Sequence, residues 1–578
     1  MVSGVSNYRR EPAPPALQLR ARRGACFSPR MNHALVFEAL AAAYPDRECI
    51  VTPTRRLSYA QVADHMRRLA SVLHAHGLGC RRERAELANH ESGQDHVGFY
   101  LLNCPEYIEG MLGCYRARSA PFNVNYRYVD DELCYLFDDA DAVAVVYHAR
   151  YAPTLARIRG RLPKLRLLLQ VDDGSGERLL PGALDYAAAL AAASPPGPPV
   201  RPAPDDLYII YTGGTTGAPK GVLWRQEDIF HAAMSGGPPG FDGPTTIADL
   251  VAEAEHGTYM RTLPVPPLMH GAAQWVAFGA IHKGGTVVLQ GNPEKLDPED
   301  VWGTAERERV STIAIVGDAF ARPLLDGLDQ RQYDLSRLFI VGSGGAILSP
   351  HNKQAFLERL PHVTVVDGFG ASETGAQGSH ASRGGEAIST GTFSMAGAVV
   401  LKQDFSGLVE PGADEIGWVG RAGQVPLGYY KDAAKTARTF PVVGGTRYAV
   451  PGDHARLLAD GTIVVLGRGS VSINTGGEKV YAEEVEQVLR RHPAVYDAVV
   501  VGTPDERFGE RVTAVVQPRA GVPPSAEELV AFAAQHLARY KLPKTTVLVD
   551  EMVRSPSGKP DYRWARARAL EARGLPAG

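Results

Sequence analysis

The chain has 578 residues, of which 44% are hydrophobic and 22% charged, and its formal net charge is -3 at pH 7. This is ordinary globular composition, and the length predicts several domain-sized units with a large buried core. A net charge this close to zero excludes a positive electrostatic field that would bind nucleic acid or an anionic membrane non-specifically. No apolar run reaches the roughly 18–20 residues of a transmembrane helix.

Six cysteines lie in the first quarter of the chain and form no Cys-x-x-Cys pair. This pattern predicts buried, reduced thiols of a cytoplasmic protein and favours neither a disulfide framework nor a zinc site. Residues 1–30 carry six arginines against one glutamate, with several prolines and no apolar segment. They are predicted to be a disordered basic tail; a translation start at Met31, where a domain-like pattern begins, is the alternative.

The first third of the chain alternates between helical and strand-like patterns. Apolar spacing predicts a helix over residues 32–43, and Ser58 is a suitable N-cap for an amphipathic helix after a short strand. Pro105 suits the first turn of the helix that follows the predicted strand 96–103, and residues 142–148 are typical of another buried strand. This alternation predicts a mostly parallel sheet covered by helices.

Three later segments place apolar strands before glycine-bearing turns. They are TIAIVGDAF (312–320), RLFIVGSGG (337–345) and VTVVDGFGASETG (363–375). Because ligands bind at the carboxyl ends of strands in open α/β sheets, these turns predict a shared pocket. The alternative is that each glycine serves only the geometry of its turn.

The pattern changes after residue 415. Asp460 and Gly461 separate two alternating segments and predict an antiparallel hairpin. A compact α+β unit follows Arg468, and Ser525 with Glu528 forms a capping box at the start of its last long helix. The predicted fold class is α/β: a large N-terminal domain of parallel-rich sheets covered by helices, with a small antiparallel subdomain, followed by a small α+β C-terminal domain.

The stretch YTGGTTGAPKG, residues 211–221, holds four glycines, three threonines and one lysine directly after a strand-like segment. Such a loop exposes backbone N–H groups and hydroxyls that can wrap phosphate oxygens. The spacing fits neither the Walker pattern nor the G-x-G-x-x-G dinucleotide fingerprint. A flexible surface loop is the alternative, but the bias toward hydrogen-bond donors favours a phosphate site.

This stretch resembles the signature loop of the adenylate-forming (AMP-binding) superfamily, which includes acyl-CoA synthetases, aryl-CoA ligases, firefly luciferase and the adenylation domains of peptide synthetases. The resemblance covers about residues 31–570, and further motifs follow in the family's order. They are PPLMHG (266–271), GSGGA (342–346), DGFGASETG (367–375), PGDHA (451–455), GRGSVSINTGGEKVYAEEVE (467–486) and SPSGK (555–559). The resemblance implies an N-terminal AMP-binding domain over 31–469 and a mobile C-terminal AMP-binding domain over 470–578.

The resemblance also implies a reaction in two steps. A carboxylate attacks the α-phosphate of ATP to give acyl-AMP and pyrophosphate, and a thiol then displaces AMP; such chemistry depends on positioning and charge neutralisation. Lys559, Glu373 and Thr212 are the implied catalytic residues, with Glu373 holding Mg²⁺. The residues implied to bind the nucleotide are Thr212, Gly213, Gly214, Thr215, Thr216, Gly217, Lys220, Gly344, Gly345, Ala346, Asp367, Gly368, Phe369, Thr374, Asp453 and Arg468.

Several of these residues have an implied chemical role of their own. Phe369 is expected to sandwich adenine against flat glycine backbone, Thr374 to contact the α-phosphate, and Asp453 to accept hydrogen bonds from the ribose hydroxyls. Lys559 is implied to swing in and stabilise the charge of the adenylation transition state. The C-terminal domain is then implied to rotate about Ser470. The residues implied to line the CoA side are Gly476, Gly477, Lys479 and Lys541.

For the acid, the resemblance implies a pocket gated by His270. Its candidate residues are His270, Gly271, Gln274, Trp275, Val316, Gly317, Asp318, Ala319 and Gly342. Most are small or apolar and none is a lysine or arginine, which favours a bulky apolar acid over acetate or a dicarboxylate. The YTGGTTG form, VNYRYV (124–129) and INTGGEKV look most like actinobacterial fatty-acyl or steroid-side-chain CoA ligases.

The predicted function is that of an ATP-dependent acid–CoA ligase for a medium-chain, long-chain or steroid side-chain acid, with ATP, Mg²⁺ and coenzyme A as cofactors. No carrier domain follows SPSGK, which favours a free-standing ligase over a peptide synthetase. The alternatives are an acyl-AMP ligase that loads a carrier protein, an inactive nucleotide-binding regulator, a luciferase-like monooxygenase and a scaffold. The predicted partners are the acid, ATP and CoA, without nucleic acid; a homodimer is left open, and no role is indicated for residues 79–96.

Overall fold

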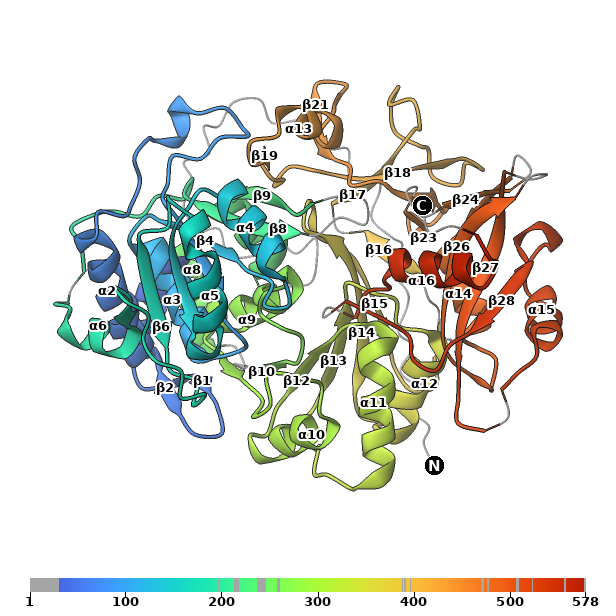
Figure 1. Ribbon diagram of the computed structural model, residues 1–578, viewed down its shortest axis with the longest axis horizontal. Coiled ribbons are helices and arrows are strands. Elements are labelled where there is room, and N and C mark those ends of the chain that lie inside the picture. Colours follow the sequence, from blue (N-terminus) through green and yellow to red (C-terminus); the bar gives the residue numbers. More distant parts are fainter. Residues whose placement is uncertain are drawn as a thin grey trace, which may run out of the picture.

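The computed structural model describes residues 31–575 except positions 196, 213–217, 236–245, 257–259, 387, 389–390, 396, 469–471, 476–477, 506–508, 522 and 556–557. The predicted basic tail, residues 1–30, lies outside this part of the chain. Figure 1 shows the N-terminal part, blue through yellow to light orange, beside the C-terminal part in dark orange and red. None of the helices within these ranges combines the length and the apolarity that a membrane crossing requires.

The first part of the chain builds a fully parallel sheet in the order β4–β3–β5–β6–β7, which confirms the predicted parallel pairing. Ser58 caps α2 in a capping box, as its sequence position predicts, and Asn32 caps α1. The elements are α1 (His33–Ala43), α2 (Tyr59–Ala75), β3 (His96–Tyr100), α3 (Pro105–Arg116), β4 (Ala120–Asn123), α4 (Asp130–Asp139), β5 (Ala142–His148), α5 (Ala152–Ile158), β6 (Leu167–Val171), β7 (Leu184–Asp185) and α6 (Tyr186–Ala192).

A second, larger sheet starts parallel and turns antiparallel. Its parallel half has the order β1–β11–β10–β12–β13–β14, and β2 pairs antiparallel at its edge. The elements are β1 (Glu48–Val51), β2 (Arg56–Ser58), α8 (Ile247–His256), β10 (Arg261–Pro264), α9 (Gly271–His282), β11 (Thr286–Val288), α10 (Pro298–Arg307), β12 (Thr312–Ile315), α11 (Gly317–Gln330), β13 (Ile340–Gly344), α12 (Pro350–Arg359) and β14 (Thr364–Ala371).

The antiparallel half continues from β14 through β15, β16, β23, β22, β18, β21 and β20, with β17 beside β18. The hairpin predicted at Asp460–Gly461 is confirmed as the connection between β22 and β23. The elements are β15 (Gly375–Ser382), β16 (Thr392–Met395), β17 (Ala398–Leu401), β18 (Ile416–Ala422), α13 (Ala433–Thr439), β20 (Val442–Val443), β21 (Thr446–Ala449), β22 (Asp453–Leu457) and β23 (Ile463–Arg468).

Two helical layers cover the parallel half of the large sheet. The largest hydrophobic core combines residues of α1, α2, α3 and α9 with residues from strands of both sheets. A second core joins α10, α11 and α12 to the other face, and Figure 1 shows these helices together at the lower edge of the molecule. Burial on both faces explains why these strands are almost continuously apolar.

A short antiparallel sheet, β19–β9–β8, stands apart from the two larger ones. It consists of β8 (Leu207–Thr212), β9 (Lys220–Arg225) and β19 (Gly428–Tyr429), and β9 leads into the one-turn helix α7 (Gln226–Ile229) and the π-helical turn Phe230–Met234. The strand predicted before the glycine-rich stretch therefore belongs to a hairpin and not to a parallel sheet. Side chains alternate with a period of two residues in parallel and antiparallel strands alike, so the sequence pattern does not distinguish the two kinds of pairing.

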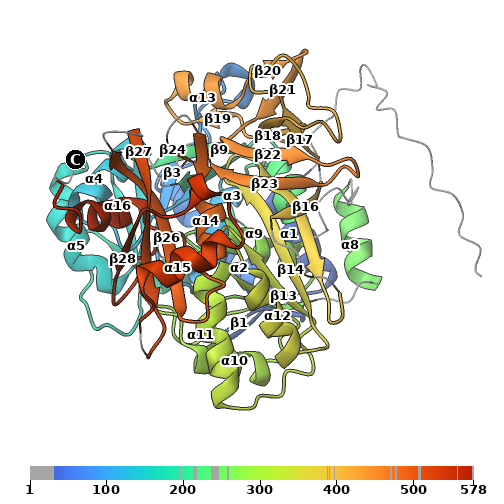
Figure 2. The same ribbon diagram turned by 90° about the vertical axis from the view of Figure 1, so that its right-hand side faces the viewer.

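The C-terminal part has a sheet of its own in the order β25–β24–β27–β26, with β28 parallel to β27. The capping box of Ser525 and Glu528 is confirmed at the start of α15. Figure 2 shows this part packed in front of α11 and the large sheet. Its elements are β24 (Ser472–Thr475), β25 (Glu478–Tyr481), α14 (Ala482–Leu489), β26 (Val495–Asp505), β27 (Gly509–Pro518), α15 (Ala526–Ala534), β28 (Thr545–Leu548) and α16 (Tyr562–Glu571).

The charged segment 79–96, for which the sequence indicates no role, is anchored by ion pairs. Arg118 donates to both carboxylate oxygens of Glu83 at 2.8 Å and to the buried carboxylate of Asp206 at 2.9 Å. The Asp95 carboxylate accepts hydrogen bonds from the Gly79 N–H and the Arg81 guanidinium, both at 2.9 Å. The segment is thus fixed to the start of β8 at one end and closed on itself at the other.

Candidate active site

The carboxyl ends of β12, β13 and β14 meet at one edge of the large sheet, as the three glycine-bearing segments predict. The strands are adjacent and parallel, and Gly342 and Gly344 pair with Val366 and Gly368. Gly342 and Gly344 lie inside β13, and Gly368 and Gly370 inside β14, where the sequence predicts turns, because backbone pairing continues along β14 as far as Ala371. Gly317 and Gly345 follow their strands, as predicted. The ends of β13 and β14 form a platform, defined here as the backbone of residues 342–346 and 367–369.

Tight backbone packing closes one side of this platform. Gly317, at the start of α11, has a φ of +55°, and a Cβ placed there would lie 2.5 Å from the Ile347 carbonyl oxygen and 2.9 Å from the Ala346 Cβ. The Gly317 N–H donates to the Ser343 hydroxyl at 3.0 Å. Gly345 has a φ of +83° and turns the chain after β13. Only glycine fits position 317, so the predicted acyl-pocket residues are held against the predicted nucleotide-binding backbone.

Two predicted site carboxylates are buried and hold α12. Asp318 accepts hydrogen bonds from the Ser349 N–H at 2.8 Å and the Asn352 amide at 2.7 Å. Asp367 forms an ion pair with the buried Lys353 at 2.9 Å, and burial raises the pKa of Asp367 to about 6 although the ammonium opposes it. Both side chains contribute to the framework beneath the platform, and their contacts with ligands stay predictions.

The turn from β14 to β15 carries Glu373 and is tied to the β8–β9 hairpin sheet. The Tyr429 hydroxyl donates to the Glu373 carboxylate at 2.7 Å, and the Trp224 indole N–H donates to the Ser372 carbonyl at 2.8 Å. Glu373 is half-buried. Sequence reasoning missed Tyr429, because nothing local marks it as a partner of a residue so distant in the chain.

The neighbouring predicted nucleotide ligands have partners within the protein. The Phe369 ring is half-buried and stacks on Phe393 with centroids 5.4 Å apart. Thr374 is fully buried; its hydroxyl accepts from the Ala371 N–H at 3.0 Å and donates to Gln377 at 2.9 Å. Phe369 offers one ring face to the sandwich expected for adenine, whereas the Thr374 hydroxyl secures the turn.

The two ends of the glycine-rich stretch are paired. Thr212 at the end of β8 lies opposite Lys220 at the start of β9. The Lys220 ammonium lies 3.6 Å from the Asp139 carboxylate of α4; burial opposes its charge, but this carboxylate raises the pKa of Lys220. Residues 213–217, the predicted phosphate ligands, lie outside the described part of the chain.

Asp453 and Arg468, the predicted ribose and phosphate ligands, lie directly opposite each other. They form the last pair of the antiparallel β22–β23 ladder, and the Asp453 side chain is buried. Gly476, Gly477 and the predicted hinge Ser470 lie outside the described residues, and Lys479 is placed only as a backbone position on β25. The Lys541 ammonium binds both carboxylate oxygens of Glu484, at 2.6 and 2.7 Å.

The C-terminal part brings Lys559 to the N-terminal part. Gly558 packs on the start of α11, where an added Cβ would lie 3.2 Å from the Val316 carbonyl oxygen and 3.3 Å from the Ala319 Cβ. Burial, together with the positive charges of Lys559 and Arg127, lowers the pKa of His270 to about 3. Lys559 therefore lies close enough to His270 for the two side chains to interact electrostatically across the domain boundary.

His270 precedes α9 and has an orphaned polar atom. Its Nε2 atom is buried and has no hydrogen-bond partner among the described residues, so a neutral imidazole is available to a bound oxygen or N–H group. The next residue, Gly271, lies under the Trp275 ring, 3.2 Å from where its Cβ would be. The Gln274 side chain accepts a hydrogen bond from the Tyr208 hydroxyl and donates one to the Leu268 carbonyl, both at 2.7 Å.

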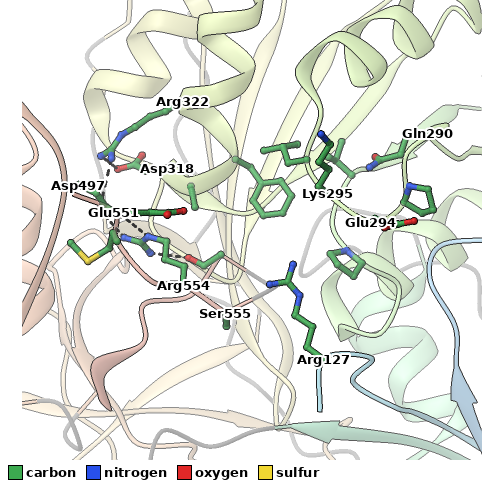
Figure 3. Close-up of a pocket in the computed structure, with 18 of the residues that line it drawn as sticks. Arg127, Gln290, Glu294, Lys295, Asp318, Arg322, Asp497, Glu551, Arg554 and Ser555 are labelled. Atoms are coloured by element: carbon green, nitrogen blue, oxygen red, sulfur yellow. Dashed lines mark hydrogen bonds and ion pairs between the residues drawn. The ribbon is translucent and has the colours of Figure 1, made fainter. Parts of the chain in front are cut away.

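A cavity of about 410 Å³ lies between the two parts of the chain, beside the Lys559 loop (Figure 3). Asp318 and Ala319 are predicted acyl-pocket residues that line it, together with Gly558 next to Lys559. Arg127 also lines it and was not among the predicted site residues, although the VNYRYV motif contains it. The signal in the sequence that could have found Arg127 was its positive charge within VNYRYV, a motif that resembles the family.

Comparisons with known proteins agree with these features. The family model described as "AMP-binding enzyme" matches residues 37–419, and that of the "AMP-binding enzyme C-terminal domain" matches residues 484–559. The chain is 52% identical to the medium-chain acyl-CoA ligase Mig of Mycobacterium avium, over 93% of this chain and 98% of that protein. It is 42% identical to the 3-oxocholest-4-en-26-oate–CoA ligase of Rhodococcus rhodochrous, over 93% of this chain and 95% of that protein.

Solved structures agree on the fold. The anthranilate CoA ligase AuaEII in complex with anthranoyl-AMP superimposes with a TM-score of 0.80 at 22% identity, over 95% of this chain and 99% of that one. A Mycobacterium tuberculosis fatty acyl CoA synthetase gives a TM-score of 0.67 at 24% identity, over 94% and 99% of the chains. With the platform, the ordered motifs and near full-length relatives in agreement, the chain belongs to the AMP-binding enzyme family.

Proposed function

We propose that this chain activates a medium-chain, long-chain or steroid side-chain carboxylic acid and transfers it to coenzyme A. The observation that carries the proposal is the similarity, over almost the whole of each chain, to ligases whose names specify medium-chain and 3-oxocholestenoate substrates. The enzyme is an AMP-forming acid–CoA ligase. The acid displaces pyrophosphate from ATP to give acyl-AMP, and the CoA thiol then displaces AMP to give acyl-CoA.

The platform and the β22–β23 ladder supply the nucleotide site. Adenine stacks between Phe369 and the backbone of residues 344–346, and Asp453 accepts hydrogen bonds from the ribose. This assignment is supported by the position of all three on one continuous sheet that runs from β13 to β22. The residues 213–217 bind the phosphates, because a run of glycine and threonine is rich in hydrogen-bond donors.

A magnesium ion fits the single carboxylate of Glu373 if the phosphate oxygens of ATP supply most of its other ligands. The described residues contain no group of three or more histidine, cysteine, aspartate or glutamate side chains that could hold a metal. Glu373 offers one half-buried carboxylate, oriented by Tyr429. Mg²⁺ commonly uses one or two carboxylates with phosphate oxygens, and it would neutralise phosphate charge when bound.

Lys559 and His270 serve the reacting carboxylate and α-phosphate. The Lys559 ammonium stabilises the negative charge that develops as the carboxylate attacks, as a preorganised cation can. The His270 imidazole stays neutral at physiological pH, since its pKa lies near 3. Its unpartnered Nε2 atom is suited to orient a substrate oxygen without adding charge.

The acid enters beside α9 and the start of α11. His270, Gly271 and Trp275 come from α9 and the residue before it, and Gly317 comes from the β12–α11 junction. Gly342 on β13 lies next to that junction because β12 and β13 pair in register. This surface is mostly apolar and favours a bulky hydrocarbon chain, since burial of apolar surface contributes about 0.8 kcal/mol for each CH₂ group.

The test is ATP–pyrophosphate exchange with acetate, benzoate, octanoate, palmitate and cholestenoate, followed by CoA consumption. We expect at least one of the last three acids to exceed acetate by about 10-fold or more, as differences of several methylene groups allow. Chelation of Mg²⁺ should abolish exchange and its re-addition should restore it. A preference for acetate would overturn the proposed substrate class, and hydroxamate formation without any use of CoA would indicate an acyl-AMP ligase.

A further inference from the structure

A buried arginine joins the two parts of the chain. Arg322 lies on α11 in the N-terminal part, and its side chain is only 7% exposed. Its guanidinium lies 3.8 Å from the Asp497 carboxylate and 5.1 Å from the Tyr496 ring centroid, both on β26 of the C-terminal part. On its own helix it lies 3.4 Å from Asp318. Figure 3 shows this arginine at one end of a chain of charged groups that crosses the boundary.

Asp497 is the centre of this charged chain. Arg554 donates to both of its oxygens, at 2.7 and 2.8 Å, and Arg490 donates at 3.1 Å. Burial disfavours the charged form, but the guanidinium groups of Arg490, Arg554 and Arg322 outweigh it and hold the pKa of Asp497 well below its usual range. An ionised carboxylate shared by several arginines fixes their positions more firmly than one ion pair would.

Arg554 passes this restraint to the loop that carries Lys559. Its guanidinium donates to the Gly558 carbonyl at 2.8 Å, one residue before the lysine. The loop is closed by hydrogen bonds from the Ser555 N–H to the Lys559 carbonyl at 2.9 Å and from the Lys559 N–H to the Ser555 hydroxyl at 3.1 Å. A continuous path of charged and hydrogen-bonding groups therefore runs from α11 to the backbone of Lys559.

We propose that Arg322 is a positioning residue for the adenylation step, which through Asp497 and Arg554 holds the Lys559 loop against the start of α11. The inference rests on the proposed function and deepens it, because it names the N-terminal group that fixes where Lys559 lies. In this role Arg322 acts through Asp497 and Arg554, not by contact with the reacting atoms. Its effect is confined to the half-reaction that uses Lys559.

The test compares the two half-reactions in Arg322→Met, which keeps an unbranched apolar stem and removes the charged guanidinium. ATP–pyrophosphate exchange with the best acid of the panel should fall by about 10- to 100-fold, the range that a misplacement of about 1 Å causes. Thioester formation from chemically prepared acyl-AMP and CoA should stay close to wild type. Arg322→Lys, which restores a cation, should recover part of the exchange rate.

Two controls separate positioning from a general structural effect. Arg359→Met removes an arginine of the N-terminal part that pairs with Asp329 on the surface. It should leave both half-reactions unchanged. In a Lys559→Ala background, Arg322→Met should cause no additional loss, because the two residues act on one interaction. Equal loss in both half-reactions, or a full additional loss in that background, would overturn the inference.

The outcome also distinguishes this inference from the proposed function. If the wild-type enzyme shows no acid-dependent exchange with any acid, the proposed function fails and the inference fails with it. If the wild type exchanges and Arg322→Met behaves like Arg359→Met, the function stands and Arg322 has no positioning role.

Discussion

The platform of residues 342–346 and 367–369 and the Lys559 loop are held in place by different forces. The platform lies on parallel strands, where backbone hydrogen bonds fix each position in register and glycines allow close approach. The loop is held by side chains, through Asp497, Arg554 and the contact of Gly558 with α11. A backbone platform cannot shift without breaking a sheet, whereas a contact between side chains can be broken and made again.

This difference matches the demands of a two-step reaction. The nucleotide must stay bound to one surface during both half-reactions, whereas the cation that serves adenylation is needed only in the first. On the proposed function, strands carry the nucleotide-binding residues, and a loop held by side-chain contacts carries the lysine. Substitutions in the Lys559 loop should slow adenylation alone. Substitutions in the platform should slow both half-reactions and lower the stability of the protein.

The largest expected effect is that of Lys559→Ala. Exchange should fall by about 10²–10³-fold, as for removal of one preorganised donor from a site that stabilises developing charge. Thioester formation from prepared acyl-AMP should be retained, and single-turnover assays of each step measure both quantities. Lys295→Ala, which removes a lysine that lines the cavity beside the Lys559 loop, is the control and should change neither step. A parallel loss of both steps would contradict the division between platform and loop.

Asp497→Asn should destabilise the C-terminal part by about 3–5 kcal/mol, because it leaves several buried guanidinium groups without their carboxylate. Guanidinium chloride unfolding followed by circular dichroism measures the loss, with Asp329→Asn, which removes a surface pair, as the control. Since the pKa of Asp497 is lowered by folding, its contribution is present above the ordinary aspartate pKa of about 3.9 and is lost as the pH falls below it. Wild type and variant should therefore converge in acid; a constant difference would argue against this linkage.

Gly317→Ala should lower the free energy of unfolding by about 1–3 kcal/mol, because the new Cβ meets the Ile347 carbonyl at a positive φ. It should also reduce both half-reactions, since it disturbs the platform. Gly303→Ala, inside α10 with open space around its Cβ, should instead stabilise by about 0.5–1 kcal/mol. Equal stability of the two variants would show that the platform tolerates movement.

The smallest effect is expected from the ionisation of His270. With a folded-state pKa near 3, the imidazole stays neutral between about pH 5 and 8, so it should add no inflection to the adenylation rate in that range. His270→Gln should change the rate but not the shape of the pH profile. Because the pKa of His270 is lowered by folding, its neutral burial reduces stability progressively as the pH falls below about 6.5. An inflection near pH 6 that disappears in the variant would contradict a neutral histidine.

Local signals predicted much of this fold. Ser58 and Ser525 start their helices as predicted, because a capping box depends only on residues three positions apart. The strands before the three glycine-bearing turns are neighbours in the sheet, and their carboxyl ends form one edge. The order of motifs, more than any single motif, identified the family that the comparisons show.

Non-local pairings were beyond such reasoning. The pairing of β9 with β19, and that of β16 with β23, depend on contacts between segments far apart in the chain. The partners of Glu373 and Arg322 come from distant segments, Tyr429 and Asp497, and neither belongs to a motif that the sequence marks. Contacts of this kind follow from how whole elements pack, and a periodic pattern within one element does not encode them.

Arg322 lies between two carboxylates, one from each side of the boundary: Asp318 on its own helix and Asp497 across from it. If the two parts separate, Arg322 keeps Asp318, and Asp497 keeps Arg490 and Arg554. No buried charge is then stranded, and separation needs no proton to be taken up or released. Glu486 pairs with Arg490, so each side of the boundary keeps equal numbers of positive and negative groups in both the joined and the parted state. Exchange between these states should therefore cost little and depend weakly on pH near neutrality.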